Sequence, residues 1–327
     1  MNWSVRSVSR NATSNSTAMA AAVGTAARCF PARCSYMRES AKTYWFSRRA
    51  IVIAMRRAAR AERANDVKGD AQFTTPFGIH HAAASFGPIA TAHMARYGTT
   101  TLDFAHLAVT ERSHAALNQK AMMRKPITID DHQNSRWIIY PFRLLDCCQE
   151  SDGGVALVIT SAERARDLKH APIYIMSGMG GQGQTAGLWE TNGANSAPLS
   201  LRGGGHHPRD VSIAEIYDPF HLHVYDAHRR LRSRKERRDR GLGQEGHNHL
   251  DGDLPVNTHG GLLSEAHIHG LNHVIEAVQQ LRPEGVVDDL CDGAHTYNRA
   301  TCRQVRDPKI ALVCGECGES AMLLRRA

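Results

Sequence analysis

The chain has 327 residues, of which 42% are hydrophobic and 22% charged, and its formal net charge at pH 7 is +8. This length accommodates two modest domains or one large one, and the composition is ordinary for a soluble globular protein. No apolar run is long enough to span a bilayer, no secretory signal opens the chain, and eight cysteines are too few for a disulfide scaffold of this size. We therefore expect a cytoplasmic protein with no membrane association, whose cysteines stay reduced.

The positive charge is unevenly distributed. An excess of this size is typical of proteins with an anionic partner, such as nucleic acid, an acidic membrane surface or a phosphorylated cofactor. The run from Arg229 to Arg240, RRLRSRKERRDR, holds eight basic and two acidic residues, a net charge of +6. It has no interleaved aromatic residues and matches no nucleic-acid-binding module, so a solvated segment is favoured over a nucleic-acid site.

Residues 1–76 are poorly patterned. The stretch is rich in Ser, Asn and Arg, and an Ala-rich patch, TAMAAAVGTAARCF, has the propensity for a helix. Ile51, Val52, Ile53 and Met55 fit either a strand or one turn of a buried helix. No strand-rich segment can be assigned here.

Residues 77 onward have the pattern of a packed protein. Pro88 is placed where a helix begins, and this helix should end at Gly98. A second helix is predicted from Leu102 to about Leu117, and Asp130 is a candidate cap for a third.

The sequence SDGGVALVITSAERARDL gives the clearest local prediction. Residues 155–159 form a short buried strand, and Thr160 with Glu163 fits a capping box that opens a helix. PIYIMSG follows as a second strand. This strand, helix, strand order with short connections predicts a parallel pair of strands in an α/β architecture.

Pattern is weaker in the middle of the chain and returns near its end. Residues 181–209 have no apolar face and read as a long loop. SIAEIYDPF is interpreted as a short edge strand or a turn. ALVCGECGESAMLLRR near the end predicts two strands across a glycine turn, a hairpin that closes the sheet.

The stretch from Asn257 to Leu281, NTHGGLLSEAHIHGLNHVIEAVQQL, carries the strongest functional signal. A Gly-Gly pair and a His-rich turn lead into an amphipathic helix with apolar residues on one face: Ile268, Leu271, Ile275 and Val278. His267, His269 and His273 are held near the helix start, and histidine suits proton transfer near neutral pH. The alternative is that these histidines are cap and core residues with internal partners.

A metal site is disfavoured. Cys314 and Cys317 form the single Cys-x-x-Cys pair, and with Cys291 and Cys302 a four-cysteine zinc site is conceivable. The second close pair that such sites use is missing, so no metal is predicted.

Several blocks together resemble a known family. They are FTTPFGI, ERSHAALNQKAMMRKPITIDDHQNSR, PFRLLDCCQESDGGVALVITSAERARDL, AEIYDPF, LPVNTHGGLLSEAHIHGLNHVIEAVQQLR and ALVCGECG. In this order they resemble the thiolase superfamily, and within it the non-decarboxylating, lipid-transfer-type (sterol-carrier-protein-x-like) thiolases, a branch that includes acetyl-CoA acetyltransferases. The blocks cover a little over half of the chain.

The resemblance implies a fold and a domain organisation. A thiolase-like α/β fold has two βαβαβ-type halves packed in five layers (αβαβα), and here the first half is expected to be incomplete. The implied boundaries are an N-terminal segment at 1–76, an N-terminal half with the CoA-loop insertion at 77–180, a linker at 181–209 and a C-terminal half at 210–327. The family also implies coenzyme A esters as substrates with no permanently bound cofactor, a homodimer, and in some members a small OB-fold partner subunit.

Catalytic positions are carried over by their place in these blocks. Counting from Gly260 and Gly261, His267 falls on the family's catalytic histidine. Tyr217 and Asp218 stand where the family has an Asn-Glu motif, so a phenol replaces a water-holding amide. Near the end, Val313 takes the place of the late cysteine, and a slip of one residue would put Cys314 there. The same comparison assigns Asn257 and His259, with the two glycines, to binding of the substrate or CoA.

The nucleophilic cysteine of thiolases has no clear counterpart. It should precede Phe77, where Cys29 and Cys34 follow the Ala-rich patch instead of preceding it, and Ser16 lacks a matched base. We expect the nucleophile to be absent. Residues 1–72, 181–209 and 226–250 are Arg-, Gly- and Ser-rich, and we hypothesise that they are read out of frame or decayed; translating the other two frames tests this.

Two functions follow from this sequence. The first is an enzyme that acts on the C–C bonds of acyl-CoA esters in lipid or sterol metabolism, by acyl transfer (thiolysis) or by retro-aldol cleavage. The second is an inactive homologue that binds acyl-CoA or lipid. Tyr217 and the unassigned nucleophile favour retro-aldol chemistry or no chemistry over thiolysis.

Overall fold

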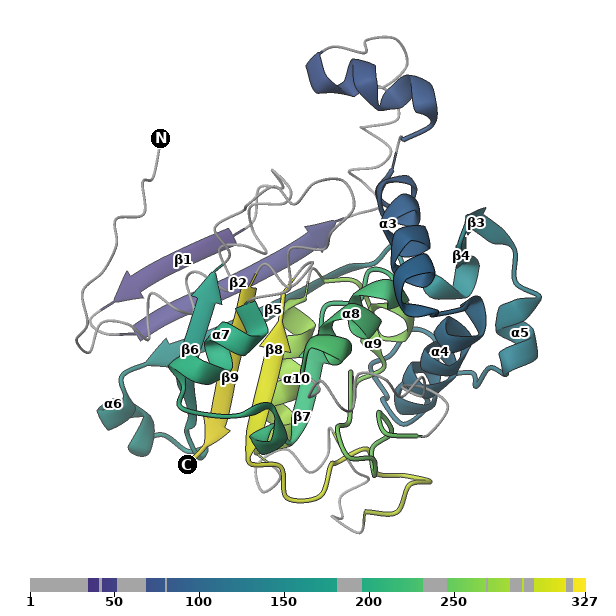
Figure 1. Cartoon of the computed structure of the whole chain (residues 1–327). Helices are drawn as coiled ribbons and strands as arrows, with labels where there is room; N and C mark the ends of the chain where they lie inside the picture. Colours follow the sequence, from purple (N-terminus) through teal and green to yellow (C-terminus); the bar gives the residue numbers. More distant parts are fainter. Residues whose placement is uncertain are drawn as a thin grey trace.

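The computed structural model describes residues 35–40, 43–51, 69–79, 81–180, 196–231, 246–268, 270–282, 290, 297–315 and 320–327. Within this part of the chain the strands form a four-stranded sheet, a three-stranded sheet and a short two-stranded hairpin, and helices pack on and between the larger sheets (Figure 1). The fold is therefore α/β, as predicted.

The four-stranded sheet lies at the centre. Its strands, in spatial order, are β6 (Ile173–Gly180), β9 (Ser320–Arg326), β8 (Ile310–Cys314) and β7 (Ile213–Ile216). β7 and β8 are parallel, whereas β9 is antiparallel to both of its neighbours. This confirms the predicted C-terminal hairpin and the prediction of an edge strand in SIAEIYDPF.

The three-stranded sheet consists of β1 (Ser35–Ser40), β2 (Thr43–Ile51) and β5 (Asp152–Thr160), all antiparallel. The predicted parallel pairing of β5 with β6 is wrong, because β5 pairs with β2 and β6 pairs with β9. Residues 35–51 also provide the N-terminal strands that the sequence did not reveal. β1 pairs with β2, and β2 pairs with β5, which lies more than a hundred residues further along the chain and leaves no local pattern in the sequence.

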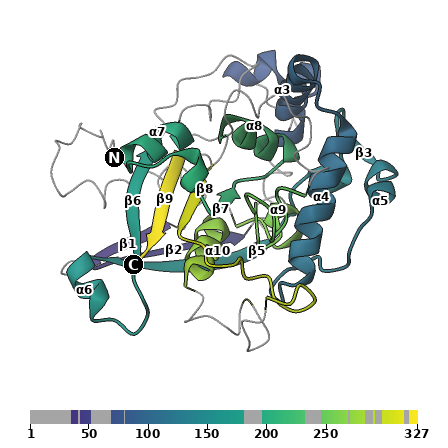
Figure 2. The same ribbon diagram turned by 60° about the horizontal axis from the view of Figure 1, so that its bottom comes forward.

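Helix α10 (Leu271–Leu281) lies between the two sheets, whereas α7 (Ser196–Gly203) and α8 (His221–Leu231) cover the opposite face of the central sheet (Figures 1 and 2). Strand residues alternate between these layers, as a pleated strand requires. Ala311 and Val313 pack with α10, and Leu312 and Cys314 pack with the cluster on the other side. The predicted helix is thus confirmed, and Leu271 and Val278 of its predicted apolar face pack into the cluster between the sheets, whereas Ile275 is half-buried and lies outside that cluster.

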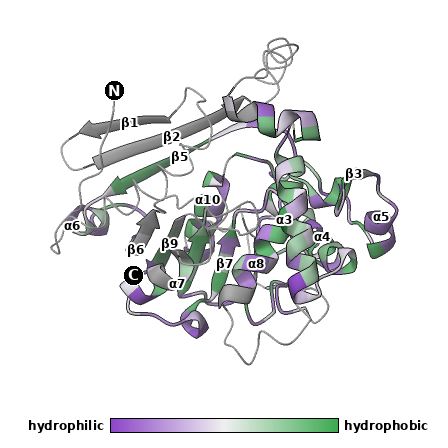
Figure 3. Ribbon diagram, turned by 45° about the horizontal axis from the view of Figure 1, so that its top comes forward, coloured by the Kyte–Doolittle hydropathy of each residue, from purple (hydrophilic) through white to green (hydrophobic). Residues whose placement is uncertain are grey.

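Strand β5 closes the layer over α10. Its residues alternate between half-buried and exposed, and Val155, Leu157 and Ile159 pack against the hydrophobic cluster around α10. Much of β5 is drawn in the green of hydrophobic residues in Figure 3. Val158, on the other face, is 52% exposed. The short helix α6 (Ala162–Arg166) follows, and its cap is Ser161, not the predicted Thr160, because Thr160 still pairs with β2.

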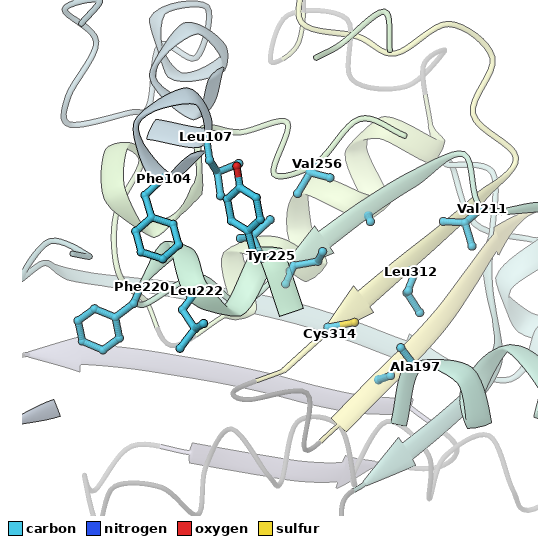
Figure 4. Packing of buried hydrophobic residues seen from close by; sticks show 14 of the residues in the cluster. Phe104, Leu107, Ala197, Val211, Phe220, Leu222, Tyr225, Val256, Leu312 and Cys314 are labelled. Carbon is cyan, nitrogen blue, oxygen red and sulfur yellow. The ribbon is translucent and has the colours of Figure 1, made fainter. Parts of the chain in front are cut away.

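The hydrophobic cluster on the α7 and α8 side of the central sheet connects this sheet to a helical region. Figure 4 shows Phe104, Phe220 and Tyr225 converging from different elements, and the rings of Phe142 and Phe220 are stacked with centroids 4.8 Å apart. This aromatic packing fixes the segment after β7 against helix α4. The position of Tyr217 depends on that segment.

The helical region contains α3 (Ala82–Tyr97), α4 (Thr101–Ala116), α5 (Ile129–Gln133) and the hairpin of β3 (Trp137–Ile139) and β4 (Phe142–Arg143). Helix α3 begins six residues before Pro88, at a cap provided by His81, so the predicted start is wrong; its end at Gly98 is confirmed. Helix α4 matches its prediction. Thr128 caps α5 instead of Asp130, because its hydroxyl and the Asp131 carboxylate form a reciprocal capping box.

Two further predictions are corrected in the middle of the chain. Helix α7 lies inside the stretch predicted as a loop, with Ala197 and Leu201 buried against the sheet. Arg229 and Arg230 belong to α8, whereas the rest of the basic run lies outside the described residues. In the part of the chain that the structure describes, no helix is both long and apolar enough to cross a membrane.

Candidate active site

Three side chains from distant segments meet at His267. The Tyr217 hydroxyl (Oη) lies 2.7 Å from Nε2 of His267, and Sγ of Cys148 lies 3.5 Å from Nδ1 of the same ring. Tyr217 is 5% exposed, whereas Cys148 and His267 are half-buried. We call these three residues the reactive cluster. The structure brings Tyr217 and His267 together as the predicted site requires, and adds a thiol that the sequence did not single out.

Backbone contacts hold His267 in place. Its N–H donates to Oγ of the buried Ser151 at 3.1 Å. Gly153 lets β5 approach this loop, since a Cβ there would meet Ile268 at 2.7 Å. Gly270, with φ of +78°, performs the same role beside Tyr217, where a Cβ would lie 2.7 Å from Cδ2 of the ring.

Cys148 is placed by a segment that lies between two loops of the site. The Cys148 N–H donates to the Pro219 carbonyl at 3.0 Å, on the Tyr217 side. The Gln149 side chain donates to the Leu263 carbonyl at 2.7 Å, on the His267 side. No site role was predicted for the residues LLDCCQESDGG. The sequence signal that could have pointed to Cys148 is the adjacent cysteine pair, which is followed by polar residues within a block that resembles the family.

Asp218 faces away from the reactive cluster, into the protein. Its carboxyl group accepts a hydrogen bond from the Leu262 N–H at 2.9 Å and lies 3.0 Å from Nε2 of His273. Burial and the nearby Glu111 carboxylate raise the pKa of Asp218 well above its ordinary value, and burial lowers the pKa of His273 to about 4. The contact between Asp218 and His273 supports the loop carrying Tyr217. His269 lies outside the described residues.

A second group of titratable side chains is entirely buried. His221 places Nδ1 3.1 Å from Asp146 and Nε2 3.3 Å from Glu111, and Nε2 of His132 lies 2.7 Å from the same Asp146 oxygen. We call these four residues the buried network. Burial opposes the charge on His221, but the hydrogen bonds to Asp146 and Glu111 outweigh it and raise its pKa to about 10.

The buried network has the residue types of a metal site, since ligand atoms of His132, Asp146 and His221 lie within 4.8 Å of one another. The hydrogen bonds of these residues explain their arrangement without a metal ion. The Gln133 amide donates to Nδ1 of His132 at 3.3 Å, so Nε2 carries the proton that Asp146 accepts. Both nitrogens of His221 face carboxylates and are donors. Each nitrogen that a metal would need is thus occupied by a hydrogen bond.

The residues predicted to bind substrate or CoA have structural contacts. Asn257 is buried, accepts a hydrogen bond from the Ile216 N–H at 2.7 Å and donates to Glu111 at 2.9 Å. His259 is buried, with nitrogens 3.0 Å from Glu215 and 3.6 Å from Glu265. Burial opposes its charge, but these carboxylates outweigh that effect and raise its pKa to about 10.

The glycine pair allows close packing. Both residues have positive φ, +108° at Gly260 and +66° at Gly261. A Cβ on Gly260 would meet Ala115 at 2.5 Å, and one on Gly261 would touch the Asp218 carboxylate. Glycine is therefore required at both positions because the loop packs directly against α4 and Asp218.

The predicted cysteines are not gathered at the site. Burial raises the pKa of the Cys314 thiol to about 12, which makes it a poor proton shuttle, although its carbonyl accepts the Tyr217 N–H at 3.0 Å. Cys302 is disulfide-bonded, which contradicts the expectation that all cysteines stay reduced. Cys29, Cys34, Cys291 and Cys317 lie outside the described residues, as does Ser16.

An apolar cavity of about 530 Å³ lies on the helical region, between α3 and the β3–β4 hairpin. Phe77, Ile79, Pro88 and Tyr140 are among the residues that line it. None of the residues predicted for the site line this cavity, so it is assigned no catalytic role.

Comparison with known proteins agrees with this architecture. The family model described as "Thiolase C-terminal domain-like" matches residues 183–322. The solved Ltp2-ChsH2(DUF35) aldolase aligns with a TM-score of 0.72 and 33% sequence identity, covering 95% of this chain and 75% of that one. The chain belongs to the thiolase superfamily, in its sterol-carrier-protein-type branch.

Two curated relatives narrow the comparison. A steroid side-chain-cleaving aldolase of Thermomonospora curvata is 42% identical over 224 residues, and the 17-hydroxy-3-oxo-4-pregnene-20-carboxyl-CoA lyase of Mycobacterium tuberculosis is 41% identical over 236 residues. The alignments cover 64% and 69% of this chain, and 57% and 61% of the two relatives. An acetyl-CoA acetyltransferase of Methanothermobacter thermautotrophicus is 29% identical over 209 residues, 61% of this chain and 54% of its own length.

Proposed function

We propose that this protein is a lyase that cleaves a C–C bond of a steroid acyl-CoA by a retro-aldol reaction. The observation that carries the proposal is the contact of 2.7 Å between the Tyr217 hydroxyl and Nε2 of His267. It provides a proton-transfer pair at a half-buried position without requiring a covalent acyl-enzyme. The similarity to the steroid side-chain aldolase and the steroid acyl-CoA lyase supports this choice of reaction.

The chemistry requires removal of one proton and addition of another. The substrate is a CoA thioester with a hydroxyl group on the β-carbon. Tyr217 passes its proton to His267 and takes the proton of that hydroxyl, the bond between the α- and β-carbons breaks, and a ketone and a thioester enolate form. Protonation of the enolate at the α-carbon then releases the shorter acyl-CoA. Such acid–base assistance typically contributes a factor of about 10²–10⁴ in rate.

Acyl transfer is the less supported activity. It needs an activated nucleophile that receives the acyl group from CoA, and the sequence before Phe77 offers no clear counterpart of the cysteine that thiolases use. The acetyl-CoA acetyltransferase relatives are also less similar to this chain than the aldolase and the lyase. The substrate, a CoA ester, is common to both reactions, and no permanently bound cofactor is proposed.

The proposal includes a partner. The structural relative is a complex of Ltp2 with a DUF35 protein, ChsH2. By this similarity, a small OB-fold subunit of the DUF35 type would complete the assembly, and the homodimer expected for the family remains part of the proposal. A cytoplasmic location is also proposed, because the sequence has an ordinary composition and no apolar run long enough to span a bilayer.

The test is turnover of the purified full chain, alone and with a DUF35 partner. The substrate is the CoA ester named for the M. tuberculosis relative, and the measured products are the steroid ketone and the shortened acyl-CoA, separated by liquid chromatography and mass spectrometry. Release of both products in equal amounts is expected. Binding of the CoA ester without either product would instead support the second function, an inactive acyl-CoA-binding homologue.

A further inference from the structure

Cys148 contacts a base, unlike the other reduced cysteines. Among the described residues, Cys147, Cys148 and Cys314 carry reduced thiols. Cys147 directs Sγ to the Arg143 carbonyl at 3.4 Å, and burial with the nearby Asp146 carboxylate raises its pKa. Cys314 is 3% exposed within the hydrophobic cluster. Cys148 is half-buried and lies 3.5 Å from Nδ1 of His267.

An imidazole beside a thiol makes that thiol a nucleophile. The thiolate is the reactive form, and a neighbouring histidine that accepts the thiol proton increases its population. Nδ1 of His267 is in position to accept this proton, and the backbone contacts of His267 and Cys148 hold the pair on both sides. Cys148 is half-buried, unlike the fully buried Cys314.

The reactive cluster has one base and two acidic groups. Neutral imidazole has a single lone pair, so at any moment His267 accepts a proton either from Tyr217 at Nε2 or from Cys148 at Nδ1. A chemical change at Cys148 must therefore alter the ability of His267 to accept the proton of Tyr217. This links modification of the thiol to the chemistry of the phenol.

We propose that Cys148 is a site of reversible thiol modification, at which thiol–disulfide exchange with coenzyme A disulfide switches the reactive cluster off. The proposal rests on the proposed function in one respect, namely that the site admits the CoA portion of its substrates. The CoA sulfur is then delivered close to the residues that act on the acyl chain, and therefore close to Cys148.

The exchange is balanced without a further oxidant. The Cys148 sulfur attacks one sulfur of coenzyme A disulfide, a bond forms between Cys148 and that sulfur, and the original S–S bond breaks. The Cys148 proton passes to His267 and then to the departing CoA thiolate. One disulfide replaces another, and the CoA group bound to Cys148 occupies the space beside His267.

The experiment treats the full-length protein with coenzyme A disulfide and follows the modified cysteine by peptide mass spectrometry. We expect Cys148 to gain one CoA group at least about ten times faster than Cys147, because only Cys148 has a base. Glutathione disulfide, which lacks the CoA portion, should react more slowly. Dithiothreitol should remove the label and restore lyase turnover.

Variants separate a reactive thiol from a structural one. Cys148→Ser should prevent the loss of lyase turnover that coenzyme A disulfide causes. This loss is measured as a fraction of the variant's own starting rate. Cys147→Ser is the matched control and should leave the response unchanged, because serine can donate the same hydrogen bond to Arg143. His267→Gln should slow labelling of Cys148 by about tenfold, whereas Tyr217→Phe should leave it intact or faster, since the imidazole then serves the thiol alone.

The outcomes distinguish this proposal from the proposed function. Lyase turnover with no label on Cys148, or with labelling that is indifferent to His267→Gln, would overturn the modification site and leave the lyase standing. Rapid, His267-dependent labelling of Cys148 in a protein without lyase turnover would support the site and refute the lyase. Equal labelling by glutathione disulfide would overturn the assignment to CoA.

Discussion

The reactive cluster and the buried network each centre on a histidine, but they differ in burial and in the kind of group that contacts its ring. In the buried network, both nitrogens of His221 face carboxylates and the residue is 1% exposed. In the reactive cluster, His267 is half-buried and its two contacts are a phenol and a thiol. A histidine between two carboxylates is fixed as a cation, whereas one between two weak acids can gain and lose a proton.

This difference assigns stability to one region and chemistry to the other. Removing a partner from the buried network leaves an uncompensated charge in a low dielectric, which is costly for folding. Removing a partner from the reactive cluster leaves no unpaired formal charge, and Cys148 and His267 are only half-buried, so the cost in folding is smaller, but a proton-transfer step is lost. Each prediction below tests one side of this comparison.

The largest effect is expected from Tyr217→Phe. The substitution removes the hydroxyl that contacts Nε2 of His267, so lyase turnover should fall by about 10²–10⁴-fold while the free energy of unfolding changes little. Turnover of the steroid acyl-CoA and thermal unfolding are the measurements. Tyr174→Phe, on β6, is the matched control. Equal losses of activity in the two variants would contradict the role of Tyr217.

The buried network should respond in the opposite way. His221→Asn leaves Asp146 and Glu111 without the cation between them, and we expect the free energy of unfolding to fall by about 3–5 kcal/mol. Denaturant titration followed by fluorescence measures this loss. The exposed His170 provides a control, since His170→Asn should change stability by less than about 0.5 kcal/mol. A small effect at His221 would mean that the network is not structural.

Gly270→Ala sharpens the comparison by moving Tyr217 without changing its chemistry. Alanine at φ of +78° costs about 1–2 kcal/mol, and its Cβ would lie 2.7 Å from the Tyr217 ring. Gly98→Ala carries the same strain at φ of +74° with no atom within 4 Å. Both variants should lose stability through this backbone strain, with a further loss in Gly270→Ala from the contact with the Tyr217 ring, while only Gly270→Ala loses turnover, by roughly tenfold. Equal turnover in both would show that the position of Tyr217 is not critical.

The last prediction concerns pH dependence. The pKa of His221 is about 10 in the folded protein and near its ordinary value of 6.5 when unfolded. Its contribution to stability is therefore complete below pH 6.5 and is lost as pH rises from there towards 10. Comparing wild type with His221→Asn between these pH values, the wild type should lose up to about 1.4 kcal/mol more per pH unit. Parallel curves would argue that His221 is neutral.

The sequence predicted the elements whose signals are local. Helix α10 follows from the spacing of its apolar residues, the β8–β9 hairpin from two strand-forming runs across a glycine turn, and the end of α3 from Gly98. His267 and Tyr217 were selected by their places in blocks that resemble the family, and the structure brings them within 2.7 Å. Capping residues were less predictable, since Thr128 and Ser161 each lie within two residues of the predicted caps and compete for the same N–H groups.

The tertiary structure alone decided which residues meet and how deeply they are buried. Cys148 and His267 are separated by 119 residues, and Tyr217 and His267 by 50, so neither contact has a local signature. β5 forms its sheet with β2, which lies more than a hundred residues earlier in the chain. The chain contains many histidines, and their residue type cannot distinguish a buried cation such as His221 from a partly exposed base such as His267. That distinction is set by the dielectric and the partners that packing supplies, which exist only once the chain has folded.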